Sequence, residues 1–280
     1  MVFGALAIWV GLLVYGLARR AFGPFLIFGL GLMLFLNGRY LIEGAVDGIA
    51  FFIGIYDVLI NIGLADDQTA AAVSKCAGND CTVWGERYVN HPAWGVAFYE
   101  RFASGPEFRS TLLYGHIVAN SLVFIILHIQ MLRPGGSAAS HKLLGRISFA
   151  ILTVGVGCAV WLASQHGPVE EYGGAWSAWG FYSMSAFVYG TAIFGIVAIR
   201  SGDAARHRVW MWRFAGSMWG SFWLFRVLLF VIDPILRDVQ SAAILTCIWG
   251  SAPAGILIAE LIRRRIDRGA RSPSNAVPAE

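Results

Sequence analysis

Five ionisable side chains lie inside, or at the start of, long apolar runs of the sequence. They are two histidines in one run, two histidines that begin later runs, and one arginine: His116, His128, His141, His207 and Arg226. Ionisable groups are costly in hydrocarbon, so each is a candidate functional residue. Imidazole is a common axial ligand of b-type haem, and a guanidinium pairs well with carboxylates such as the haem propionates. These residue types therefore predict a haem-binding site.

The spacing of the two histidines in the same run restricts how they are used. His116 and His128 are 12 residues apart, which places them about 18 Å apart along a helix and roughly 120° apart around it. A single partner helix does not face both. We expect an inner haem site that draws on His128, His141 and His207, or an outer site that draws on His116 and His166. The candidate iron ligands are His116, His141 and His207.

Each histidine also has a structural interpretation. His141 and His207 stand beside basic loops, where an imidazole is often an interfacial cation. His116 lies one helical turn before Asn120 and suits an interhelical hydrogen bond equally well. His91, which precedes a proline in a polar segment, is expected at the surface.

Two arginines lie in one later run, 209–232. Arg226 lies well inside it, and Arg213 lies near its start. Arg226 binds a propionate, a quinone oxygen or a lipid phosphate, or else it forms a structural ion pair. The acidic residues available for such a pair are Glu43, Asp47 and Asp57. For Arg213 we expect that the guanidinium extends to the lipid headgroups.

The elements that must position these residues are membrane-spanning helices. Hydrophobic residues make up 57% of the 280, charged residues make up 14%, and the mean hydropathy is +0.63. A soluble domain has about a quarter charged residues. The apolar runs are roughly 20 residues long, the length that crosses a bilayer. We expect an all-α, polytopic bundle of seven spans, at 3–18, 24–42, 110–132, 146–165, 179–199, 209–232 and 240–262.

The basic residues predict the orientation. Most of the 21 Lys and Arg residues fall in segments that seven spans put on one side, namely 19–20, 133–146, 200–208 and 263–271. Basic loops remain in the cytoplasm. We therefore expect an external N-terminus, a cytoplasmic C-terminus and a location in the bacterial inner membrane.

The segment 47–64 is apolar but short, and Asp57 and Asn61 interrupt it. We expect an external interfacial helix; as an eighth span it would place Arg19 and Arg20 outside.

An aromatic and acidic external cap follows, in which Cys76 and Cys81 suit a disulfide on an oxidising face, with two free thiols as the alternative. The predicted regions are 1–64, the cap at 65–109, a four-helix core at 110–232, the last helix at 233–268 and a disordered cytoplasmic tail at 269–280.

Signatures of soluble enzymes are missing from the sequence. It contains no Gly-rich phosphate loop, no His-Glu-x-x-His motif and no nucleophile elbow. It also has no basic amphipathic region of the kind that reads nucleic acids. The bilayer is the expected partner, together with a quinone or other membrane subunits.

Three motifs carry a family resemblance. They are Tyr114-Gly115-His116 on one helix, His141-Lys-Leu-Leu-Gly145-Arg146 entering the next, and His207-Arg-Val-Trp-Met-Trp-Arg213 followed by Arg226. From about 110 to 232 the chain resembles the bacterial membrane family called domain of unknown function 2306. Its histidine-bearing helix starts are similar to those of b561-type haem-binding bundles, and this likeness implies haem without establishing it.

Three functions follow as hypotheses. The first is a b-type cytochrome-like protein that transfers electrons through a histidine-ligated haem. The alternative is a non-catalytic structural, assembly or accessory subunit of a larger membrane complex. The third is a small-molecule transporter. The sequence leaves open whether the protein is an enzyme.

Overall fold

The computed structural model describes residues 2–44, 48, 61–63, 107–132, 137–164, 175–235 and 240–270. Several predictions lie outside these residues: nearly all of the interfacial helix at 47–64, the cap at 65–109 except its last residues, the Cys76–Cys81 disulfide, His91, His166 and the tail from 271. These remain predictions.

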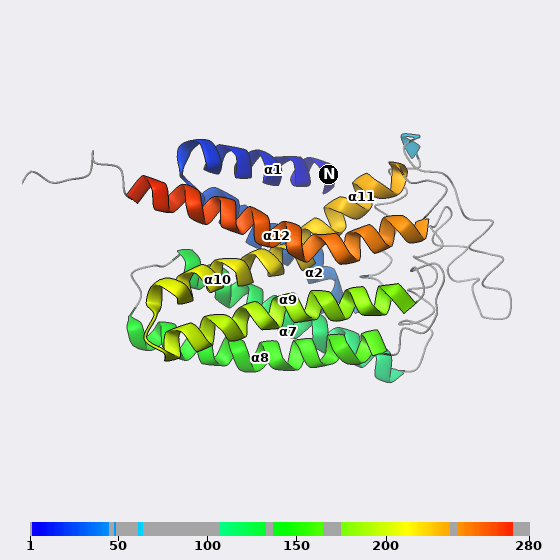
Figure 1. The fold of residues 1–280 in the computed structure, drawn as a ribbon. Helices are drawn as coiled ribbons and strands as arrows, with labels where there is room; N and C mark the ends of the chain where they lie inside the picture. The colour runs from blue at the N-terminus through cyan, green and yellow to red at the C-terminus, as the bar shows by residue number, and fades with distance from the viewer. Residues whose placement is uncertain are drawn as a thin grey trace, which may run out of the picture.

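The described residues fold into helices (Figure 1). The helices are α1 (Val2–Arg19), α2 (Gly23–Ile42), α7 (Glu107–Leu132), α8 (Ala138–Ser164), α9 (Ala175–Arg200), α10 (Ala204–Trp219), the π-helical turn η2 (Gly220–Leu224), α11 (Phe225–Ile235) and α12 (Gln240–Ala270). Among the described residues, α2, α7, α8, α9 and the Ile244–Arg268 part of α12 are long and apolar enough to cross a membrane. The all-α, membrane-spanning fold is therefore confirmed.

Several helices begin earlier or end later than the apolar runs predict. Helix α8 starts at Ala138 rather than at 146 because Ser137 caps it: the Ser140 amide donates to the Ser137 Oγ at 3.2 Å. Helices α9 and α10 begin at 175 and 204 rather than at 179 and 209. Helix α12 continues to Ala270 instead of ending at 262, since ion pairs one turn apart, such as Arg263–Asp267, support its polar end. Hydropathy alone misses these polar helical turns.

A tight turn joins α9 to α10. Gly202 adopts a φ of +81°, and the amides of Gly202 and Asp203 donate to the carbonyls of Ile199 and Ala198 at 3.2 and 3.0 Å. This is a Schellman termination, which favours glycine at the left-handed position. Asp203 then caps α10 by accepting from the Arg206 amide at 2.8 Å. The turn therefore holds the first turn of α10 against the last turns of α9.

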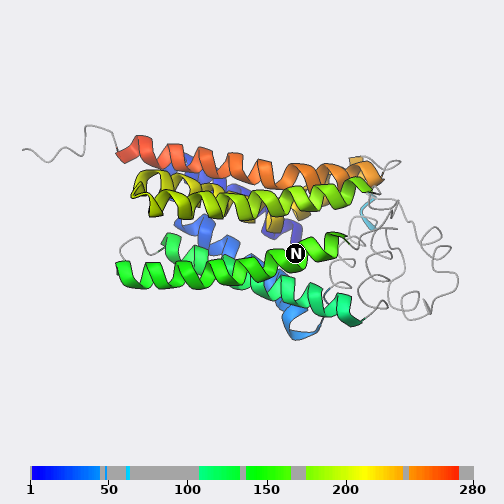
Figure 2. The same ribbon diagram turned by 60° about the horizontal axis from the view of Figure 1, so that its bottom comes forward.

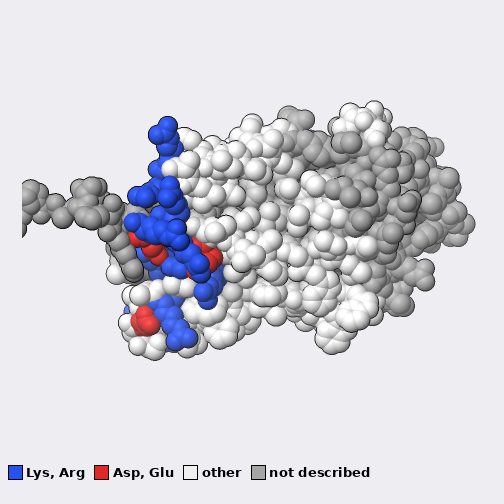
Figure 3. Space-filling view, turned by 45° about the horizontal axis from the view of Figure 1, so that its top comes forward, with Lys and Arg blue, Asp and Glu red and all other residues white. Residues whose placement is uncertain are grey.

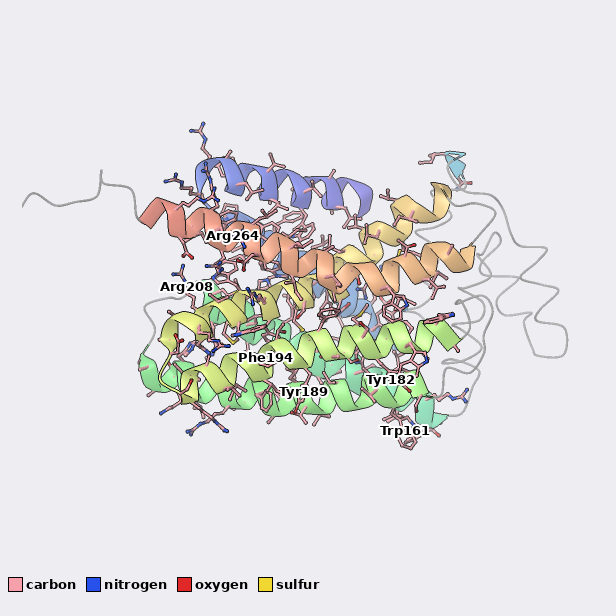
Figure 4. The ribbon with its side chains drawn as sticks, in the orientation of Figure 1. Trp161, Tyr182, Tyr189, Phe194, Arg208 and Arg264 are labelled. Atoms are coloured by element: carbon pink, nitrogen blue, oxygen red, sulfur yellow. The ribbon has the colours of Figure 1, made fainter. Side chains whose placement is uncertain are left out.

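The helices alternate in direction, so most basic residues gather at one end of the bundle. Arg265 in α12 donates to the Leu17 carbonyl of α1 at 2.7 Å, and Arg208 in α10 pairs with Asp267 of α12 at 3.0 Å. Figure 3 shows Lys and Arg concentrated at that end, and Figure 4 labels Arg208 and Arg264 there. We call it the basic end. At the opposite end, the Tyr114 hydroxyl of α7 donates to the Leu41 carbonyl of α2 at 2.6 Å.

An aromatic cluster joins the N-terminal helices to the rest of the core. Trp9 of α1 stacks on Phe25 of α2 with ring centroids 5.1 Å apart, and Phe25 meets Trp219 of α10 edge-on at 5.3 Å. Figure 2 shows α8 and α7 on one side of the bundle, with α9, α10 and α12 on the other. Large apolar side chains such as Ile27, Val154 and Leu257 are exposed on the outer surface, as lipid contact requires.

Candidate functional site

Two of the predicted ligand residues meet at the basic end. His141 lies in the first turn of α8, and His207 lies in the first turn of α10. Their ring centroids are 6.4 Å apart, and the ring planes are nearly perpendicular at 89°. His141 is exposed and His207 is half-buried. We call these residues the histidine pair.

Hydrogen bonds orient the His207 ring and hold the backbone at His141. The Nδ1 of His207 lies 2.8 Å from the Gly195 carbonyl oxygen of α9. A carbonyl only accepts, so in the neutral ring Nδ1 carries the proton and Nε2 has the lone pair. Gln130, near the end of α7, donates to the His141 carbonyl at 3.0 Å and fixes the start of α8. The Schellman turn at Gly202 sets the contact between His207 and Gly195, which are 12 residues apart.

His128 is placed differently from the other predicted ligands. It is fully buried, and both ring nitrogens have partners: Nδ1 lies 2.8 Å from the Phe124 carbonyl, and Nε2 accepts from the Trp219 indole at 3.3 Å. Its ring also stacks on Phe124 with centroids 4.1 Å apart. These contacts join α7 to α10 and leave the imidazole poorly suited to ligate a metal.

A cavity lined by described residues lies in the half of the bundle away from the basic end. It has a volume of about 260 Å³, and α2, α7, α8, α9, α10, η2 and α11 all contribute to its wall. Most of the lining is apolar, including Leu113, Val188 and Phe222; the polar residues are Asn37, Tyr40, His116, Asn120, Ser185, Ser221 and Arg226. His116 and Arg226 are thus in one cavity, separate from the histidine pair. We call it the central cavity.

Hydrogen bonds define the state of His116. Its Nδ1 lies 3.0 Å from the Gly155 carbonyl oxygen of α8. The Asn120 Nδ2 also lies 2.9 Å from the same Nδ1. The neutral ring therefore has two tautomers here: in one Nδ1 donates to Gly155 and Nε2 accepts, and in the other Nδ1 accepts from Asn120 and Nε2 donates. Asn120 donates to the His116 backbone carbonyl at 2.9 Å. The predicted interhelical role of His116 is thus seen, through Gly155, and it is compatible with ligand binding through Nε2.

Arg226 lies next to an irregular segment of its helix. The run 209–232 is not one continuous α-helix as predicted: the π-helical turn η2 interrupts it, and the Phe225 amide donates to the Gly220 carbonyl. The Arg226 guanidinium donates to the Phe222 carbonyl, four residues earlier, at 2.5 Å. Such π-helical turns are rare and are frequent at functional sites. Of the acidic partners considered for Arg226, Glu43 pairs instead with Arg39 at 3.1 Å, and Asp47 and Asp57 lie outside the described residues.

Arg213 does not simply extend to the headgroups. Its Nε lies 3.7 Å from an oxygen of Glu260 in α12, and its guanidinium lies 4.6 Å from the centre of the Trp210 ring. Glu260 also accepts from Arg263 and Arg264. The contact of Arg213 with lipid headgroups stays a prediction, and the acidic residue on α12 is a second partner for its guanidinium. No sequence signal links positions 213 and 260.

The sequence analysis also did not predict the residues that contact or accompany the candidate ligands, namely Gln130, Gly195, Tyr40 and Trp219. Asn37 and Tyr40 are three residues apart and so share one face of α2. Two polar residues on one face of an apolar run are a sequence signal that could have predicted this part of the site. Gly195 acts through its backbone carbonyl, which the residue type does not reveal.

One family model matches the chain. It is described as predicted membrane protein (DUF2306) and covers residues 113–262, just over half of the chain. The match extends beyond the predicted 110–232 core to include most of α12. No curated protein and no solved structure is detectably similar. The match brings no cofactor or activity with it, so haem binding stays a prediction. The chain is a member of the DUF2306 family of membrane proteins.

Proposed function

We propose that the protein is a b-type cytochrome-like electron carrier that holds a haem between His141 and His207. The observation that carries the proposal is the spacing of the pair. An imidazole nitrogen lies about 2 Å from its metal and the ring centre about 1 Å further, so two axial rings have centres roughly 6 Å apart. The observed 6.4 Å fits this arrangement, and the rings come from different helices.

The surroundings of the histidine pair support the same role. The Gly195 carbonyl orients the His207 ring and leaves Nε2 as the ligating nitrogen, as a carbonyl bonded to the other ring nitrogen does for metal-bound imidazoles. Lys142 and Arg206 adjoin the pair in sequence and suit the propionates. A haem held here supplies one-electron chemistry. The central cavity offers a poorer fit, since its 260 Å³ lies below the usual range for drug-sized ligands and its lining includes a single imidazole.

We further propose that the basic end faces the cytoplasm of a bacterium and that the protein lies in its inner membrane. The positive-inside rule supports this orientation. The exposure of His141 at the basic end then makes the histidine pair accessible to a cytoplasmic electron-transfer partner.

Absorption spectra test the haem proposal. The full chain is expressed with a haem precursor, purified in detergent, and recorded oxidised and dithionite-reduced. We expect a Soret band, an α-band in the spectrum of the reduced protein, and one haem per chain. In His141→Gly and His207→Gly the haem content should fall about tenfold or more, as for loss of a metal ligand, and added imidazole should restore the spectrum.

Three outcomes contradict the haem proposal. Colourless wild-type protein overturns it, and stoichiometric copurification of other subunits would then favour an accessory role. Haem retained in both glycine variants shows that the histidine pair is not the ligand set. If haem is lost in His116→Gln but kept in the two glycine variants, the cofactor binds at the central cavity instead.

A further inference from the structure

The central cavity has a chemistry of its own that the haem proposal does not use. It is lined by seven elements in a bundle that exposes many large apolar side chains on its outer surface. A molecule that enters such a site from the bilayer must itself be largely apolar. The volume of about 260 Å³ accommodates a single substituted ring but not an extended polar solute.

The larger polar groups reach the central cavity from three helices. Tyr40 comes from α2, His116 and Asn120 come from α7, and Arg226 comes from α11. Tyr40 and Asn120 are each only 7% exposed. A ligand with several oxygens can bond to more of these groups than a ligand with one polar atom.

The polar groups also differ in hydrogen-bonding character. Arg226 has only donors and suits a carbonyl or phenolate oxygen. The Nε2 of His116 accepts from a hydroxyl when Nδ1 donates to Gly155, and it donates to a carbonyl when Nδ1 accepts from Asn120. A guanidinium donor and an imidazole that donates or accepts according to its tautomer, in one apolar cavity, match a ring that interconverts carbonyl and hydroxyl oxygens.

We propose that the central cavity binds the head group of a quinone or hydroquinone. Apolar side chains such as Met184, Val188 and Phe222 contact the ring faces, and the polar residues bind the ring oxygens. The π-helical turn η2 contributes Ser221 and Phe222 to the wall and is followed directly by the helix that carries Arg226. The site is separate from the histidine pair, so its occupation does not depend on bound haem.

Binding of ubiquinone-1 and menadione, which carry short or no tails, tests the proposal directly. Each is titrated into the full-length protein in lipid nanodiscs, with binding followed by calorimetry and by the melting temperature. Wild type should bind one quinone per chain and melt at a higher temperature when it is bound.

Three variants locate the site. Ser185→Leu fills the cavity without removing a charge and should weaken binding about tenfold or more while the melting temperature of the free protein is retained. Arg226→Gln should weaken it by about tenfold, the effect of losing a charged hydrogen bond. The matched control is Arg208→Gln, the same change at the basic end, where Arg208 pairs with Asp267; it should bind like wild type.

Several results would overturn the proposal. The first is that the wild type shows no saturable quinone binding. The second is that binding survives Ser185→Leu, because quinone that does not occupy the cavity is partitioning into the lipid. Titration with decanoate provides the remaining test: saturable, Arg226-dependent binding of decanoate without binding of quinone assigns the cavity to a carboxylate-bearing amphiphile instead. None of these readouts requires haem, so they are independent of the spectra of the histidine pair.

Discussion

At the scale of single residues, Glu260 is the acid on which the basic end depends. Its carboxylate contacts Arg213, Arg263 and Arg264, and its side chain is only 14% exposed. Asp267, about two helical turns further along α12, contacts Arg208 and Arg263. The two acids therefore neutralise a cluster of arginines and join α10 to α12. A basic end made of arginines alone would be opened by repulsion between like charges.

We expect Glu260→Gln to destabilise the protein by roughly 1–3 kcal/mol, because it removes the charge that several partly buried guanidinium groups share. Thermal melting in detergent measures the change. Glu43→Gln is the matched control: the Arg39–Glu43 pair is exposed, and its loss should cost about 0–1 kcal/mol. Equal effects in the two variants would show that the cluster contributes no more than a surface pair.

At the scale of elements, the crossing of α10 and η2 with α12 determines how closely the bundle packs. A Cβ added at Gly216 would lie 2.7 Å from the Ala259 Cβ and 2.8 Å from the Ile256 Cα, and one at Gly220 would meet the backbone of Ser251. Glycine lets the backbones of two helices approach at this crossing. Gly216 and Gly220 therefore act in helix packing. The same close approach lies beside the π-helical turn and holds Phe222 and Arg226 at the central cavity.

We expect Gly216→Ala to cost roughly 1–3 kcal/mol, the usual penalty for overpacking against atoms that have no room to move. The melting temperature should fall accordingly. Gly157→Ala in α8 is the control, since nothing lies within 4 Å of its added Cβ; there the substitution should be neutral or stabilise the helix by up to about 1 kcal/mol. A Gly216→Ala variant as stable as Gly157→Ala would contradict the close crossing.

At the scale of the whole molecule, the helices place most of the basic residues at one end. The ends of α1, α7, α9 and α12 and the starts of α2, α8 and α10 meet there, as seven alternating spans require. Helix α2 ends and α7 begins at the opposite end, where Tyr114 contacts Leu41. This arrangement agrees with the predicted seven spans in the described part of the chain.

Reporter fusions test the proposed orientation. Green fluorescent protein fused after Glu280 should fluoresce in a bacterial host, and alkaline phosphatase fused at the same position should be inactive, because the proposed orientation places the basic end in the cytoplasm. Alkaline phosphatase fused after Glu43, at the opposite end of the bundle, should be active. The reverse pattern would place the histidine pair on the outer face.

The sequence by itself determined the membrane fold, the approximate spans and the alternation of basic connections, because hydropathy and charge act locally along the chain. It also singled out His141, His207, His116 and Arg226 as residues that are costly in a membrane. Only the tertiary structure decided how these residues are grouped. His141 meets His207 because the Gly202 turn and the cap at Ser137 place two helix starts together, while His116 and Arg226 share a cavity beside a π-helical turn that periodicity does not predict. His128 packs against Trp219 because contacts between helices, unlike hydropathy, depend on residues that lie far apart in the chain.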